Sequence, residues 1–131
     1  MRVSILALMS LALIQAADAR ASDTPSGAKE IVLSAELAGE VSGTTVPEQP
    51  ATFFMHVPTR RDFSIRVAAD NGPCGFDIRR SSSSGFQSDV TRFPASRKFT
   101  AQEGETFIFS FFQTRTAFVE RKGCSFTLSV N

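Results

Sequence analysis

The segment Thr106-Phe107-Ile108-Phe109-Ser110-Phe111-Phe112 decides the fold, because its apolar residues recur as they do in a strand with a buried face. The chain then passes through residues 113–123, which are polar and basic, and returns as a second alternating run, residues 124–130. This pattern predicts a C-terminal hairpin. Because a tight turn needs only about two to five residues, the longer connection is either a functional loop or a flexible surface loop.

Shorter runs with the same period precede this segment, and turn-forming residues separate them. We expect residues 51–57 and 63–67 to follow each other at hairpin spacing, and residues 37–47 to be rich in turns. No sustained helical period occurs beyond the first 21 residues. The sequence therefore predicts an all-β fold, an antiparallel β-sandwich of jelly-roll-like type. Besides the two C-terminal runs, the predicted strands are residues 30–34, 51–57, 63–67, 75–79 and 97–100.

The start of the chain has the organisation of an export signal. Met1 and Arg2 form a short basic region, residues 3–14 are apolar, and small residues follow up to residue 21. The apolar run is shorter than the ~18 residues typical of a membrane span, although an uncleaved anchor is the alternative. We predict that residues 1–21 are a signal peptide, that residues 22–131 form a single domain, and that the mature protein is exported.

The chain contains two cysteines, Cys74 and Cys124, and both lie beyond the predicted signal peptide. In an exported protein such a pair most simply forms a disulfide. A bridge that closes a loop of about fifty residues stabilises a domain by about 4 kcal/mol in the chain-entropy model. A metal site is not expected, because His56 is the single histidine and two thiols add too few ligands.

The charge pattern favours a protein partner over nucleic acid. The formal net charge is only +1, so no strong field attracts a polyanion. The first part of the mature chain is acidic, whereas Lys and Arg predominate from Arg60 onward. A local basic surface of this kind would suit a partner with an acidic cleft.

The sequence contains no arrangement of side chains that indicates an enzyme. His56 lies within a predicted strand, where we expect a half-exposed position. Glu103 and Glu105 flank Gly104, and we interpret both as polar residues of a turn rather than as a catalytic pair. Phosphate loops, dinucleotide fingerprints and zinc-binding helices are also absent from the sequence, so no cofactor is expected.

All thirteen aromatic residues are phenylalanine, and most fall on the inward positions of predicted strands. We therefore interpret them as core residues. The alternative is an aromatic platform for a sugar or a base, for which Phe54, Phe86 and Phe118 are the candidates because they lie off the core faces or in loops.

Arg115 is the strongest candidate for a binding residue. It lies close to the end of a predicted strand, where the chain is held, rather than in the middle of the loop. Its guanidinium has five donors in a planar fork that suits a carboxylate. The alternative is a solvated or ion-paired arginine at a strand end.

Several segments resemble the periplasmic inhibitors of goose-type lysozyme, small bacterial proteins whose β-sandwich is similar to prepeptidase C-terminal domains. Residues 38–43, Ala-Gly-Glu-Val-Ser-Gly, resemble the family's Ser-Gly-Glu-Ile-x-Gly segment. Residues 51–57 and 63–67 resemble its next two strands. Residues 104–115 resemble its strand that ends in Gln-Thr-Arg, which corresponds to Gln113, Thr114 and Arg115 here.

The resemblance implies a bacterial protein, periplasmic or secreted, that binds lysozyme and is not itself an enzyme. In the family, the loop after this strand enters the active-site cleft of the lysozyme and presents arginines to its acidic residues. Arg115 corresponds to the first arginine. The second falls on Val119, so Arg121 would have to replace it, and the family's tyrosine after the Gly-Glu segment falls on Thr44. The implied partner-binding residues are Gln113, Thr114, Arg115, Arg121 and Thr44.

A different class of function also fits the sequence. A noncatalytic module could hold peptidoglycan or another envelope polymer on a sheet face, through Phe54 and neighbouring arginines.

Overall fold

The computed structural model describes residues 24–46, 48–69, 74–82, 86–89 and 94–131, with the backbone alone described for 86–89. The signal peptide predicted for residues 1–21 lies outside these ranges. The described part of the chain contains no helix with the length and hydropathy that a membrane span requires.

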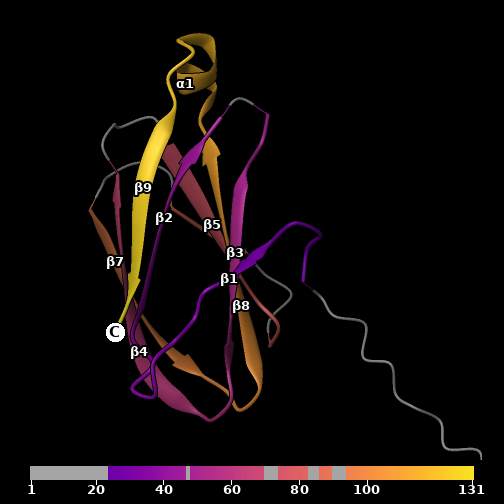
Figure 1. Cartoon of the computed structure of the whole chain (residues 1–131), viewed down its shortest axis with the longest axis vertical. Helices are drawn as coiled ribbons and strands as arrows, with labels where there is room; N and C mark the ends of the chain where they lie inside the picture. The colour runs from indigo at the N-terminus through magenta and orange to yellow at the C-terminus, as the bar shows by residue number, and fades with distance from the viewer. Residues whose placement is uncertain (1–23, 47, 70–73, 83–85, 90–93) are drawn as a thin grey trace, which may run out of the picture.

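Two β-sheets pack face to face, as predicted (Figure 1). The first sheet has the order β1-β3-β8-β5-β6 and the second the order β2-β9-β4-β7. Adjacent strands are antiparallel except for β1 and β3, which are parallel. The first sheet consists of β1 (Lys29–Glu30), β3 (Ala51–Val57), β8 (Glu105–Gln113), β5 (Cys74–Arg80) and β6 (Phe86–Asp89). The second consists of β2 (Gly39–Thr45), β9 (Cys124–Val130), β4 (Arg61–Ala69) and β7 (Ala95–Ala101).

The predicted C-terminal hairpin is wrong. The strand β8 pairs with β3 and β5, whereas β9 pairs with β2 and β4, so the two runs belong to opposite sheets. The connection between them crosses the end of the sandwich and contains a short helix, α1 (Arg115–Val119). Facing sheets stand about 10 Å apart. An extended chain covers about 3.3 Å per residue, so the crossing itself needs only about three residues, and the rest of the connection forms α1 and the turns beside it.

Two other local expectations need correction. The strands β3 and β4 follow each other closely but also lie in different sheets, so they do not form a hairpin. The segment 37–47, expected to be rich in turns, contains the seven-residue strand β2, which pairs with β9 along its whole length. Pairing with a long partner strand outweighs the weak strand propensity of its glycines.

The core consists mainly of phenylalanine, as predicted. Phe111 of β8 stacks on Phe126 of β9 with ring centroids 3.7 Å apart, and Phe53 of β3 meets both rings edge to face. Burial of each such ring stabilises the fold by about 1.5–3 kcal/mol. The buried phenylalanines of the described chain are Phe53, Phe63, Phe76, Phe99, Phe107, Phe109, Phe111 and Phe126.

Each end of the sandwich has a cross-link between the sheets. At the α1 end, the predicted disulfide joins Cys74 of β5 to Cys124 of β9, with Cα atoms 5.7 Å apart. At the opposite end, Arg80 of β5 donates to both carboxylate oxygens of Glu105, at 2.8 and 3.0 Å, and to the carbonyl of Thr100 in the other sheet, at 2.8 Å. The disulfide is buried, whereas the Arg80 side chain is 21% exposed, and each cross-link ties the two sheets together.

Candidate functional site

The α1 connection, residues 113–123, projects from one end of the sandwich (Figure 1). Its helix is closed at the C-terminal end by two hydrogen bonds, from the Arg121 N–H to the Phe118 carbonyl and from the Lys122 N–H to the Ala117 carbonyl. These bonds form a Schellman motif, with Arg121 as its left-handed residue at φ 52°. The connection is therefore an ordered structure rather than an irregular loop.

Arg115 is the first residue of α1, and its side chain is exposed. No hydrogen bond or ion pair joins it to another described residue, so the guanidinium can meet an external carboxylate. Thr114 precedes it at the N-cap with φ −67° and ψ 162°, and its hydroxyl makes no capping bond. The contribution of Thr114 to the helix start is therefore its extended backbone, which sets the direction in which α1 begins.

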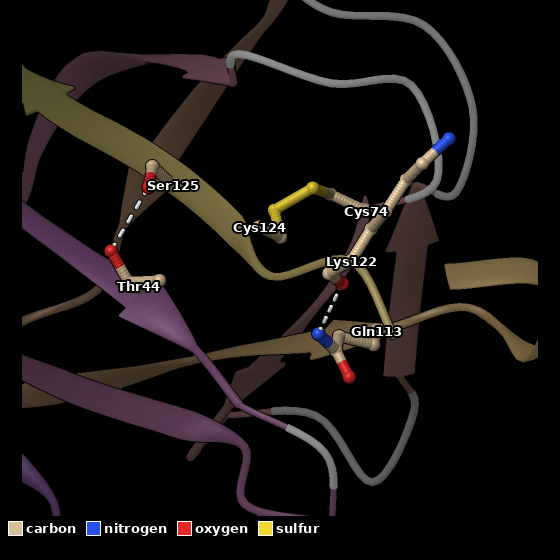
Figure 2. The surroundings of a disulfide bond; sticks show 6 residues. All are labelled: Thr44, Cys74, Gln113, Lys122, Cys124 and Ser125. Carbon is tan, nitrogen blue, oxygen red and sulfur yellow. Dashed lines mark hydrogen bonds between the residues drawn. A yellow bond between two sulfur atoms is a disulfide. The ribbon is translucent and has the colours of Figure 1, made fainter. Parts of the chain in front are cut away.

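Gln113 is the last inward-facing residue of β8, since the buried alternation at Phe107, Phe109 and Phe111 continues to it. Its Nε2 donates to the carbonyl of Lys122 at 2.5 Å, which ties the two ends of the connection together (Figure 2). Its Oε1 is buried without a partner among the described atoms. This placement makes Gln113 a brace for the connection.

Thr44 lies at the same end of the molecule, on the outer face of β2. Its Oγ1 is 3.0 Å from Oγ of Ser125, the residue after the bridged Cys124 (Figure 2). A β-carbon added to Gly123 would come within 3.5 Å of Cγ2 of Thr44. Thr44 thus packs beside the base of the connection, rather than at its tip.

Arg121 lies two residues beyond α1, so the helix separates it from Arg115. Arg121 is exposed, whereas the neighbouring Lys122 is paired with Glu120 at 2.7 Å. The five residues implied by the resemblance therefore lie at one end of the sandwich. Of these five, Arg115 and Arg121 are exposed cations without an ion-pair partner among the described residues.

Val119 takes the position of the second arginine of the resembling family, and its side chain is 73% exposed. The adjacent Phe118, a platform candidate, is 46% exposed, while Ala117 is buried against the sandwich. The sequence showed Phe118 in a loop, but its place on an exposed helical face depends on α1. The sequence offered no usable signal for this placement, because five residues are too few for a helical period to be recognised.

Glu105 differs from its interpretation as a polar turn residue, because the side chain is almost fully buried. Burial alone would raise the pKa of Glu105, but hydrogen bonds from Arg80, Ser82 and the Gln102 N–H outweigh that effect and lower the pKa to about 2. The alternation along β8 could have predicted this burial, because Glu105 lies two residues before the inward-facing Phe107 and so points to the same face of the strand. Gly104 adopts the turn conformation expected of it, at φ 70°.

The remaining candidates lie elsewhere. His56 is exposed on β3 and its Nδ1 is 3.1 Å from Thr106 Oγ1. Phe54 is half-buried on the outer face of the first sheet, and the side chain of Phe86 lies outside the described residues. Among the described residues, no cluster of three His, Cys, Asp or Glu side chains could hold a metal ion.

The fold and the site define a β-sandwich protein with a braced, basic helical connection at one end. No family model and no curated protein matches the sequence. Solved structures do match. The pre-peptidase C-terminal domain of a collagenase from Bacillus anthracis aligns with 83% of this chain and 99% of its own length, at 13% identity and a TM-score of 0.62.

Periplasmic inhibitors of g-type lysozyme match as well. The inhibitor from Salmonella Typhimurium covers 79% of this chain and 97% of its own length, at 13% identity and a TM-score of 0.55. The inhibitor from Aeromonas hydrophila covers 79% and 95%, at 10% identity and a TM-score of 0.51. At these identities the likeness establishes the fold, a sandwich of the pre-peptidase C-terminal type, and confirms the fold expected from the sequence resemblance.

Proposed function

We propose that this protein is an exported inhibitor of a lysozyme of the goose type, which enters the active-site cleft with the α1 connection around Arg115. The proposal includes cleavage of residues 1–21 as a signal peptide and a periplasmic or extracellular location. In this function the protein has no catalytic site or cofactor of its own, and its partner is a protein.

The observation that carries the proposal is the state of Arg115. Its exposed guanidinium stands at the start of a helix whose base is held by the Gln113 bond to Lys122 and by the disulfide. Because the base is already ordered, binding loses less conformational entropy than binding by a free loop. The fold shared with inhibitors of g-type lysozyme supports the same reading. Thr44, Thr114 and Gln113 then act by positioning the connection, and Arg121 supplies a second cation.

A turbidity assay with a purified goose-type lysozyme tests the proposal. We expect the mature protein to inhibit lysis of bacterial cells, and Arg115→Ala to weaken inhibition by about 2 kcal/mol or more, roughly thirtyfold, as for an interface hot spot. Arg66→Ala is the matched control, because Arg66 is an exposed arginine on β4, a strand that is not part of the α1 connection. Equal inhibition by wild type and Arg115→Ala would refute the assignment of the site.

A second candidate function rests on the outer face of the first sheet. The register there places Phe54, Ile108 and Arg79 side by side on β3, β8 and β5. An apolar ring and a guanidinium on either side of Ile108 would suit a polymer of amino sugars in the cell envelope. Sedimentation with purified peptidoglycan that is lost in Phe54→Ala, without any effect on lysozyme, would favour this module.

A further inference from the structure

The exposed large apolar residues of the described chain are unevenly distributed. They are Val32, Val46, Phe118 and Val119, at 83%, 48%, 46% and 73% exposure. Val46 directly follows Thr45, which pairs with the bridged Cys124, and Phe118 and Val119 lie on α1. Three of the four therefore occur at the α1 end of the sandwich, toward which β2 runs (Figure 1). We refer to Val46, Phe118 and Val119 as the apolar tip.

The apolar tip shares a helical face with a cation. Residues three and four apart are neighbours on a helix surface, so Arg115 lies beside both Phe118 and Val119. Ala117 faces the sandwich and holds the opposite side of the helix against it. A partner that pairs with Arg115 would therefore also cover the two apolar side chains.

The backbone of the tip is held in place at both of its segments. Val46 belongs to a turn in which the Gln49 N–H donates to its carbonyl at 3.1 Å. The helix ends in the Schellman motif, where Arg121 keeps a left-handed conformation that costs a non-glycine residue about 1 kcal/mol or more. An exposed apolar surface on an ordered backbone is typical of a docking site, because it loses little entropy when it is covered.

The charges around the apolar tip indicate which kind of protein surface it can bind. Arg115 and Arg121 have no ion-pair partner among the described residues, whereas Lys122 is neutralised by Glu120. The nearest acidic residue of the β2–β3 turn is Glu48, and it forms no ion pair within the described chain. The apolar tip thus has two exposed cations on the same connection, Arg115 on its helical face and Arg121 just after the helix. It fits a cleft that has an apolar wall next to carboxylates.

We propose that the apolar tip is the central contact of this protein with its partner, a protein cleft with an apolar wall, and that Arg115 and Arg121 meet carboxylates at the rim of that cleft. The inference rests on the proposed function and deepens it. An arginine at position 119 would contact the partner mainly through its charge, whereas Val119 makes an apolar contact. The cleft that fits this protein therefore has an apolar wall beside its acidic groups.

The test is inhibition and calorimetric binding of a goose-type lysozyme by the mature protein and its serine variants. We expect Phe118→Ser and Val119→Ser each to raise the inhibition constant about tenfold or more, as for buried contacts at the centre of an interface. Phe118→Leu should retain most of the inhibition. The binding heat capacity should be less negative in the serine variants, because less apolar surface is buried.

Val32→Ser is the matched control, since Val32 is the fourth exposed apolar residue and lies in the β1–β2 segment. It should leave the inhibition constant unchanged, and all these variants should melt with the wild type because the residues are exposed. Full inhibition by both serine variants would overturn the inference and leave the proposed function standing. A gain of about tenfold in Val119→Arg would also overturn it, because charge would then dominate the contact.

Two outcomes separate this inference from its alternatives. If the wild type inhibits no goose-type lysozyme, the proposed function fails and the inference fails with it. If the wild type binds vesicles of phosphatidylglycerol through the tip, and the serine variants lose only that binding, the tip recognises lipid and the inference is wrong.

Discussion

Arg121 and Glu105 are the residues whose conformation or environment is least expected from their type. Arg121 has a positive φ, which favours glycine, and Glu105 is a buried carboxylate. Each is held by specific hydrogen bonds to neighbouring groups. Their consequences for stability can be tested separately, because the two residues lie at opposite ends of the sandwich.

Replacement of Arg121 by glycine should stabilise the protein. Glycine adopts φ 52° without the steric penalty that a β-carbon brings, so Arg121→Gly should raise the free energy of unfolding by up to about 1 kcal/mol. Urea denaturation measures the change. Arg121→Ala, which removes the charge but keeps the β-carbon, is the control and should show no such gain. A loss of stability in the glycine variant would mean that the arginine side chain itself supports the connection.

Loss of the Glu105 charge should destabilise the fold. Glu105→Gln breaks a buried ion pair with Arg80 and should lower the free energy of unfolding by about 2–3 kcal/mol, because Arg80 is partly exposed and can be resolvated. The pKa of Glu105 is about 2 in the folded protein, below its usual 4.5, so its contribution is complete above pH 4.5 and is lost as pH falls toward 2.

Acid denaturation of the wild type and Glu105→Gln measures this effect. The difference in stability between them should shrink between pH 4.5 and about 2, since the wild-type carboxylate takes up a proton on unfolding over that range. A difference that stays constant with pH would show that packing, rather than the charge, accounts for the cost of the variant.

At the scale of elements, the sequence predicts which residues of a strand face the core better than it predicts which strands pair. The inward residues of β3, β4 and β5 follow directly from alternation, because successive side chains point to opposite faces of a strand. The sheet to which each strand belongs is not encoded locally. Strands adjacent in sequence, such as β8 and β9, can pair with each other or cross to the facing sheet with the same alternation.

For the α1 connection, too, the sequence predicts some features and not others. Its basic character and the importance of Arg115 as a candidate could be predicted from residue type and position. The helix could not, since five residues are too few for a period to be recognised and isolated helices of this length are unstable in water. Contact of Ala117 with the sandwich and the bond from Gln113 to Lys122 hold it in place. The apolar tip therefore became visible only in the folded chain.

At the scale of the whole molecule, the disulfide joins the two sheets beneath the α1 connection. The bridge spans 50 residues in sequence, so the Cys74→Ala/Cys124→Ala variant should lose about 4 kcal/mol of unfolding free energy in the chain-entropy model. Urea denaturation of the variant and of reduced wild type should give the same midpoint. Unchanged stability in both would mean that the core alone determines the relative position of the sheets.

The sequence by itself determined the all-β class, the inward faces, the phenylalanine core and the pairing of Cys74 with Cys124, because these depend on local alternation, composition and a single possible cysteine pair. The tertiary structure decided which strands share a sheet, the burial of Glu105 by Arg80, and the grouping of Val46 with Phe118 and Val119 at one end. These features depend on contacts between residues far apart in the chain, which local patterning does not specify.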